Sequence, residues 1–181
     1  MGSDLTSMVR EARPEDASAL AGLCIEVWLH TYCRPGIPSN FADYALATYS
    51  KANLACLIQD PDAHLLVETV DYPDAKQEGL RGLLHWSDKI SPPLDRCPAA
   101  EIVTLYVRDR HKGQGIGSAL LSASYREMQE AGHRSAFLSV NAENVPAAAF
   151  YLHLGFEEIG ETHFEIDGGR YRNLVLQKDF V

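Results

Sequence analysis

The spacing of apolar side chains predicts helices and strands in the first half of the chain. Residues 9–12 alternate apolar and polar, which indicates a short strand, and residues 17–32 repeat apolar side chains every three or four positions, as an amphipathic helix does. Two prolines and a glycine interrupt this pattern before residues 41–58 resume it, as one helix or as two pieces. The apolar runs 65–70 and 80–86 are separated by a charged turn, so they predict two antiparallel strands.

In the second half of the chain, predicted strands and predicted helices again follow one another. Residues 87–99 contain Pro92, Pro93 and Pro98 and no periodicity, which predicts a loop, and a loop of this kind is able to cover a site. The pattern then predicts a strand at 101–107, a helix at 116–130, a strand at 136–140, a helix at 146–154 and strands at 156–160 and 171–177 joined by a turn at 167–169. The predicted order is β α α β β β α β α β β. We therefore expect an α/β fold in which a central mixed, mostly antiparallel sheet is flanked by helices.

The length and composition indicate one globular domain. The 181 residues are 46% hydrophobic and 23% charged, as in an ordinary folded protein. We expect the domain to span residues 8–181. Residues 1–7 read as a leader or a disordered N-terminus, because Met8 could itself begin the chain just before the first strand.

The charge and the special residues restrict the class of protein. Sixteen basic and 25 acidic side chains give a net charge of −9, which argues against nucleic acid as a partner and suits a cationic small molecule. No apolar run is long enough to cross a membrane and no signal peptide is apparent, so we expect a cytoplasmic protein. The four cysteines have no C-x-x-C spacing and the seven histidines are scattered, so we expect free thiols and no metal site.

A glycine-rich stretch between a predicted strand and a predicted helix carries the clearest chemistry. It reads Lys112-Gly113-Gln114-Gly115-Ile116-Gly117-Ser118. Alternating glycines let the backbone N–H groups approach an anion, and the following helix N-terminus adds partial positive charge, so a pyrophosphate is the predicted occupant. Arg108, Arg110 and His111 lie just upstream and add to the charge. The stretch matches neither the G-x-G-x-x-G dinucleotide fingerprint nor the nucleotide P-loop, and a glycine turn that serves only chain geometry is the remaining alternative.

These residues resemble the acetyl-coenzyme A binding segment of the GNAT superfamily of N-acetyltransferases, whose signature is Gln/Arg-x-x-Gly-x-Gly/Ala. Residues 112–117 fill that frame, with lysine at the first place. An alternative register over residues 110–115 satisfies the signature literally, but it would start the helix two residues earlier, so we prefer the first. Residues 141–144 and 148–156 resemble the second cofactor-contacting segment of the family, through the pattern Asn-x-x-Asn followed by Ala-x-Phe-Tyr-x-x-x-Gly-Phe.

The resemblance implies a set of residues that bind acetyl-CoA. In the family, main-chain amides of the loop hold the pyrophosphate, the strand edge pairs with the pantetheine arm, and the second segment meets the arm from the neighbouring strand. The corresponding residues here are Lys112, Gly113, Gln114, Gly115, Ile116, Gly117 and Ser118 in the loop, Leu105, Tyr106 and Val107 on the strand, and Asn141, Asn144 and Ala148 in the second segment. For the two asparagines, turn formation is the alternative interpretation.

Acetyl transfer to an amine needs a base for the amine proton and an acid for the departing thiolate. Tyr151 stands where the family carries its general acid. Glu101 lies eleven residues before Lys112, the spacing at which the histone-acetylating branch carries its general base. The alternatives are an aromatic packing role for Tyr151 and a solvated strand-end role for Glu101.

The acceptor is less well specified. Trp28 and Tyr32 end the first predicted helix and are candidate substrate-binding residues, although Trp28 also suits a core position. Their spacing to Gly36, together with residues 162–165, resembles the branch that includes spermidine/spermine N-acetyltransferases. We expect direct transfer from acetyl-CoA to a primary amine such as a polyamine. The alternatives are a protein N-terminus or lysine, and an acetyl-CoA-binding regulator without catalysis. The resemblance is also consistent with a homodimer.

Overall fold

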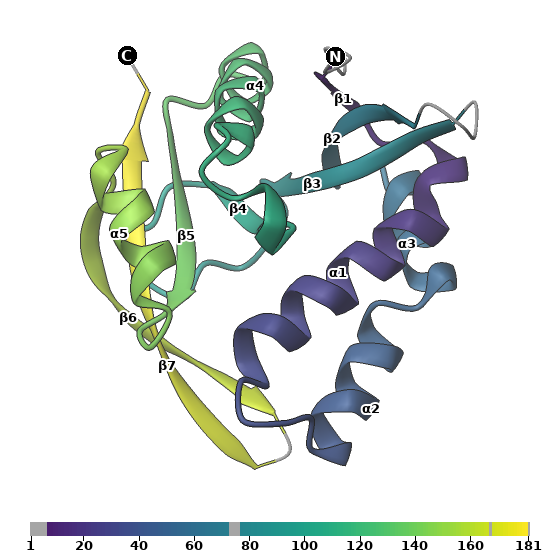
Figure 1. Cartoon of the computed structure of the whole chain (residues 1–181). Coiled ribbons are helices and arrows are strands. Elements are labelled where there is room, and N and C mark those ends of the chain that lie inside the picture. Colours follow the sequence, from purple (N-terminus) through teal and green to yellow (C-terminus); the bar gives the residue numbers. More distant parts are fainter. Residues whose placement is uncertain (1–6, 73–76, 167, 181) are drawn as a thin grey trace. The chain divides into compact units, whose positions relative to one another are not determined.

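The sequence forms seven strands and five α-helices in the computed structural model, which describes residues 7–72, 77–166 and 168–180. Figure 1 traces the chain. The strands are β1 (Ser7–Glu11), β2 (His64–Tyr72), β3 (Gln77–Ser87), β4 (Ala100–Val107), β5 (Ser135–Asn141), β6 (Glu157–Ile166) and β7 (Gly169–Asp179). The helices are α1 (Ala17–Tyr32), α2 (Ser39–Thr48), α3 (Lys51–Gln59), α4 (Ile116–Glu130) and α5 (Val145–His153).

The strands form a sheet in the order β1-β2-β3-β4-β5-β7-β6. β4 and β5 are parallel, whereas the pairs β1-β2, β5-β7 and β6-β7 are antiparallel. The expectation of an α/β fold with a mixed, mostly antiparallel sheet and flanking helices is confirmed.

Contacts divide the chain into two compact units, each built from two segments. The first contains Met1–His85 and Thr104–Ser124, and the second contains Trp86–Val103 and Tyr125–Val181. The assignment of residues 8–181 to one domain stays a prediction.

In the first unit, α1 packs against α3 over a core that the helical spacing predicts. Leu20, Leu23, Cys24 and Val27 on α1 are all buried, and Leu54 on α3 joins them. β1 lies antiparallel to β2, with Val9 opposite Glu68.

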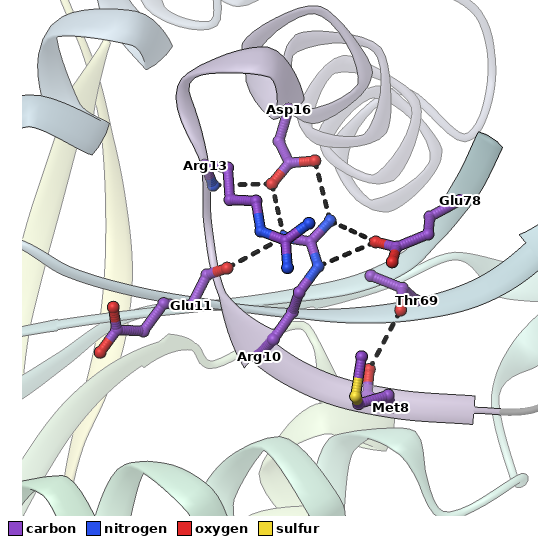
Figure 2. A network of polar contacts seen from close by, with 7 residues as sticks. All are labelled: Met8, Arg10, Glu11, Arg13, Asp16, Thr69 and Glu78. Carbon is purple, nitrogen blue, oxygen red and sulfur yellow. Dashed lines mark hydrogen bonds and ion pairs between the residues drawn. The ribbon is translucent and has the colours of Figure 1, made fainter.

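A network of charged side chains joins β1 to the start of α1 (Figure 2). Arg10 donates to both carboxylate oxygens of Asp16, at 2.7 and 3.1 Å, and its Nε donates to Glu78 at 2.8 Å. Asp16 is 8% exposed and also accepts the Arg13 backbone N–H, at 2.7 Å. The arginine therefore satisfies a buried carboxylate that ends the turn before α1.

In the second unit, β5, β7 and β6 pair side by side. Leu138 and Leu176 lie directly opposite each other on β5 and β7 and are both buried. The ring of Tyr125 on α4 stacks on Phe180, with centroids 4.7 Å apart. β4 pairs with β5 at Ala100–Ala136 and Glu101–Phe137.

Several boundaries differ from the expectations. Residues 41–58 form two helices, which is one of the two expected alternatives: Ser50 accepts the Asn53 backbone N–H at 3.2 Å and begins α3 as a separate element. β6 runs to Ile166 instead of ending at residue 160, because it pairs with β7 over its whole length, although its outer residues are polar. Ser7 is the first residue of β1, one position before the expected start of the domain, and residues 1–6 lie outside the described residues. So do residues 73–76 and Asp167, which fall in two predicted turns.

Candidate functional site

The glycine loop ends at the first turn of α4, within the first unit. Gly113 and Gly115 have φ angles of 75° and 80°, which side chains with a Cβ rarely adopt. Gly115 O accepts from Ala119 N at 2.9 Å, so the N–H groups of the three residues after Gly115 have no acceptor within the helix. A Cβ placed at either glycine would meet no atom within 4 Å, so the loop surface is open to a ligand. This arrangement suits a phosphate group.

α4 is held closely against β3 at this point. A Cβ at Gly82 would lie 2.8 Å from Ile116 Cγ2 and 2.9 Å from Leu120 Cδ1. Ile116 and Leu120 are 4% and 0% exposed. Because residue 82 has no side chain, the first turn of α4 can pack directly against β3. This packing fixes the position of the N–H groups at the start of α4.

The basic side chains around the loop are partly neutralised by carboxylates. Lys112 Nζ lies 3.1 Å from Asp109 Oδ1, His30 Nε2 lies 3.2 Å from the same oxygen, and Arg108 Nε lies 2.9 Å from Glu26 Oε2. The Lys112 and Asp109 side chains are each 56% exposed, so their pairing is weak and a phosphate can compete for the lysine.

His111 contributes less charge than its position in the sequence suggests. Burial, together with the charges of Arg81 and Arg108, lowers the pKa of His111. This imidazole is therefore neutral near pH 7. Because Lys112 and Arg108 are paired with carboxylates and His111 is uncharged, these residues add less positive charge at the loop than the sequence suggests.

The strand edge predicted for the pantetheine arm consists of half-buried residues. Leu105, Tyr106 and Val107 are all intermediate in exposure. The Tyr106 hydroxyl lies 3.0 Å from the Tyr49 hydroxyl, and its ring packs against the core of α1 and α3. Burial raises the pKa of Tyr106 well above its usual value, so the phenol stays neutral. Its side chain therefore anchors the strand within the first unit, and the backbone of β4 is the part that a ligand would pair with.

The two predicted acceptor residues differ in accessibility. Trp28 is 4% exposed and its ring centroid lies 5.1 Å from Tyr32, 5.4 Å from Phe41 and 5.1 Å from Tyr44. Tyr32 is 38% exposed. Of the two, Tyr32 is accessible to a ligand, whereas the buried Trp28 ring packs beside it.

In the second unit, Glu101 is half-buried at the start of β4, opposite Phe137. Burial raises the pKa of its carboxyl. Burial raises the pKa of the Cys97 thiol as well, and the charge of Glu101 adds to this effect. The thiol beside Glu101 is therefore neutral and a poor nucleophile, whereas the carboxylate is suited to accept a proton.

The second predicted cofactor segment forms a tight turn into α5. Asn141 Oδ1 accepts from Glu143 N at 2.8 Å, and Asn144 O accepts from Ala148 N at 3.0 Å. Asn141 is 8% exposed and Ala148 is 9% exposed. The turn-forming interpretation therefore holds for the Asn141 side-chain oxygen and leaves its amide N–H groups as the part that can bind a ligand.

Tyr151 lies on α5 and is 8% exposed. Its ring meets Phe150 and Phe156 edge-on, with centroids 5.3 and 5.4 Å away. The aromatic packing expected as an alternative is therefore present, and the role of its hydroxyl stays a prediction.

Sequence reasoning missed residues that only the strand register brings together. Asn173 on β7 lies opposite Asn141 on β5 and opposite Thr162 on β6. Its Oδ1 is buried and has no hydrogen-bond partner among the described residues. The available signal was a polar residue directly before the apolar run of residues 174–176, but the sequence did not show which strands would lie beside it.

In the described part of the chain, none of the helices has the length and apolar character needed to span a bilayer. Within the same residues, no three histidine, cysteine or acidic side chains gather as metal ligands would.

The fold and the glycine loop together are typical of the GNAT class of proteins. The model of the acetyltransferase (GNAT) family matches residues 42–156, and the chain belongs to this family. A mycothiol acetyltransferase of Corynebacterium glutamicum is 34% identical over 79 residues, which cover 44% of this chain and 25% of that protein. An N-alpha-acetyltransferase of Sulfurisphaera tokodaii is 36% identical over 69 residues, which cover 37% of this chain and 41% of that protein. The chain thus spans less than half the length of these curated relatives.

Solved structures share the fold at low sequence identity. PaiA N-acetyltransferase from Thermoplasma acidophilum, in complex with coenzyme A, has a TM-score of 0.70 and 21% identity, covering 97% of this chain and 99% of that one. NAA60 of Arabidopsis thaliana, with a bisubstrate analogue, has a TM-score of 0.69 and 19% identity, covering 97% of this chain and 100% of that one.

Proposed function

We propose that the protein is an N-acetyltransferase that moves an acetyl group from acetyl-CoA directly to a primary amine. The observation that carries this proposal is the loop of Gly113 and Gly115, whose left-handed backbone leads into unpaired N–H groups at the start of α4. Membership of the GNAT family supports the same function. When bound there, acetyl-CoA supplies an activated acetyl thioester.

In the proposed site, Lys112 and the main-chain N–H groups of residues 113–118 bind the diphosphate. Lys112 exchanges its exposed contact with Asp109 for the ligand. The backbone of Leu105 to Val107 holds the pantetheine arm as an added strand, and Asn141, Asn144 and Ala148 meet it from the second segment.

The chemistry requires two proton transfers. Glu101 accepts the proton that the amine loses as its nitrogen attacks the thioester carbonyl carbon. Tyr151 donates its hydroxyl proton to the thiolate that leaves when the carbon–sulfur bond breaks, and solvent then restores that proton. The raised pKa of Glu101 brings it closer to that of the amine it deprotonates. The neutral Cys97 thiol favours direct transfer over a cysteine-bound acetyl group.

The acceptor proposed from the sequence is a small cationic amine such as a polyamine, with a protein N-terminus or a lysine as the alternatives. The net charge of −9 supports any of these cationic acceptors. A cytoplasmic setting and a homodimer remain part of the same proposal.

The test is release of free thiol from acetyl-CoA across a panel of amines. We expect Tyr151→Phe to lower kcat at least about tenfold with little change in the affinity for acetyl-CoA. Tyr125→Phe is the matched control, because it removes a buried hydroxyl that has no partner among the described residues. Unchanged turnover in Tyr151→Phe would remove the acid assignment, and no thiol release with any amine would contradict the proposed activity.

A further inference from the structure

The last turn of α5 carries Tyr151, and a lysine of β7 reaches the end of this helix. Lys178 Nζ donates to the carbonyl oxygen of Leu154, the residue that caps the C-terminal end of α5. A Cβ placed at Gly155 would lie 3.6 Å from the same nitrogen. Carbonyl groups in the last turn of a helix have no partner within the helix and carry partial negative charge. An ammonium group at this position therefore stabilises the end of α5.

Aromatic rings lie beside the ammonium group of Lys178. Its Nζ is 5.8 Å from the centroid of the Tyr125 ring on α4 and 5.9 Å from the centroid of the Phe156 ring, which are distances of cation–π contacts. Among the described residues, no carboxylate forms an ion pair with this lysine. On β7 it pairs with the fully buried Ala136 of β5, so its stem lies on the packed side of the sheet. The charge of Lys178 therefore acts on the end of α5 and on these two rings.

The residues that end α5 also hold Tyr151. Gly155 has a φ angle of 83°, and the chain turns back there. Phe156 N donates to the Tyr151 carbonyl oxygen at 3.1 Å, and Gly155 N donates to the Leu152 carbonyl oxygen at 3.0 Å, as in a helix that ends at a glycine. The Phe156 ring meets the Tyr151 ring edge-on, with centroids 5.4 Å apart. Both the backbone and the ring of Tyr151 are therefore fixed by Phe156.

Lys178 contacts both features that fix Tyr151. It binds the carbonyl oxygen at the end of α5, and it lies beside the Phe156 ring that packs on Tyr151. Without the lysine, this carbonyl would lose its donor and the ring would lose its cation, so the last turn of α5 would be held less firmly. The first turn is held separately, because Ala148 N donates to the Asn144 carbonyl oxygen at 3.0 Å.

We propose that Lys178 is a positioning residue for acetyl transfer: it fixes the last turn of α5 and so holds the Tyr151 hydroxyl where it can protonate the departing thiolate. This inference rests on the proposed function, in which Tyr151 is the general acid. A misplacement of about 1 Å can lower a rate by up to about a hundredfold. Asn144 and Ala148, which we assign to the pantetheine arm, lie in the part of α5 that Lys178 does not hold. Loss of the lysine should therefore lower kcat and leave the KM for acetyl-CoA unchanged.

The experiment measures thiol release from acetyl-CoA by the full chain, with the most active amine of the panel. We expect Lys178→Met to lower kcat about five- to tenfold and to change the KM for acetyl-CoA by less than about twofold. Lys178→Arg should recover most of the lost kcat, because a guanidinium also donates to a carbonyl and stacks on aromatic rings. Lys89→Met is the matched control and should keep kcat. It removes the same charge from an exposed lysine of the second unit, whose partner is the carboxylate of Asp88.

A double substitution separates positioning from a general loss of stability. In a Tyr151→Phe background, Lys178→Met should lower kcat by less than about twofold, because the hydroxyl that it would displace is already absent. Equal losses of kcat in both backgrounds, or an unchanged kcat in Lys178→Met alone, overturn the inference and leave the acid assignment standing. If Lys178→Met does not fold, Lys178→Gln replaces it in the same comparison, since the glutamine keeps an N–H donor and lacks the charge.

The failure of the proposed function has different signatures. An unchanged kcat in Tyr151→Phe removes the acid assignment and this inference with it. Amide hydrogen exchange covers the case in which no amine is acetylated. Faster exchange at Gly155 and Phe156 in Lys178→Met than in Lys89→Met supports the positioning role even though the proposed activity fails. Equal exchange rates in the two proteins overturn the inference.

Discussion

Burial changes what the Glu101 carboxyl can do in this protein. It is half-buried opposite Phe137 on β5, and this burial raises its pKa above that of a solvated glutamate. A carboxylate with a raised pKa is a stronger base, but it is also protonated at a higher pH. The same residue that accelerates deprotonation of the amine should therefore set an acidic limit to activity.

We expect kcat/KM to fall on the acidic side with an apparent pKa above the ordinary glutamate range. The fall follows the fraction of Glu101 that is protonated, since only the carboxylate can accept a proton. Glu101→Gln should lower kcat by about a hundredfold and remove this acidic limb. Glu158→Gln, an exposed carboxyl on β6, serves as the control and should keep the profile. Persistence of the same limb in Glu101→Gln would assign it to another group.

The start of α4 approaches β3 closely at Gly82. Gly82 leaves room for Ile116 and Leu120, and these two side chains fix the start of the helix whose N–H groups we assign to the diphosphate. An added methyl group at residue 82 must displace either β3 or the first turn of α4.

We expect Gly82→Ala to destabilise the protein by about 1–3 kcal/mol, the usual cost of overpacking a core. It should also raise the KM for acetyl-CoA severalfold, because the helix start moves. Urea unfolding and initial rates measure the two effects. Gly22→Ala on α1 is the control, since a Cβ there meets nothing within 4 Å and alanine favours the helix. Normal KM values in a destabilised Gly82→Ala protein would argue against the role of the helix start.

The stability of the molecule against acid depends on a buried histidine. His85 is 9% exposed and its Nε2 has no hydrogen-bond partner among the described residues. Burial, with a smaller effect from His64, lowers the pKa of His85 to about 4. The unfolded chain therefore takes up a proton on this residue near pH 6.5, whereas the folded protein does so near pH 4.

The sign of the effect follows from this difference. Between these two values the unfolded state binds more protons, so stability falls as the pH drops from about 6.5 to about 4. The loss by pH 4.5 is about 2–3 kcal/mol. We expect His85→Leu to lose less stability than the unmodified protein between pH 7.5 and pH 4.5, in urea unfolding at both values. His153→Gln, exposed on α5, should behave like the unmodified protein. Equal losses in all three proteins would contradict this account.

Local signals predicted much of the fold. The bounds of α1 and α4 follow the apolar spacing and the flanking turn residues, so Ala17–Tyr32 and Ile116–Glu130 match the expected helices at both ends. The length of β6 exceeds the prediction, because the polar residues in its second half give no strand pattern. Only the pairing with β7 shows that it is a long strand. Helix signals act within one or two turns of the chain, whereas strand length depends on a partner.

Residue identity and tertiary structure contributed different parts of the candidate site. The run from Lys112 to Ser118 by itself determined the glycine loop at which we propose that phosphate binds, because glycine conformations and a helix N-terminus are local properties of the chain. Only the tertiary structure decided that Asn173 lies opposite Asn141 and that the side chain of Tyr106 is held in the core. A strand pattern shows that side chains alternate, but the register that selects their neighbours depends on segments far apart in sequence, and a slip of one residue would turn every side chain to the other face.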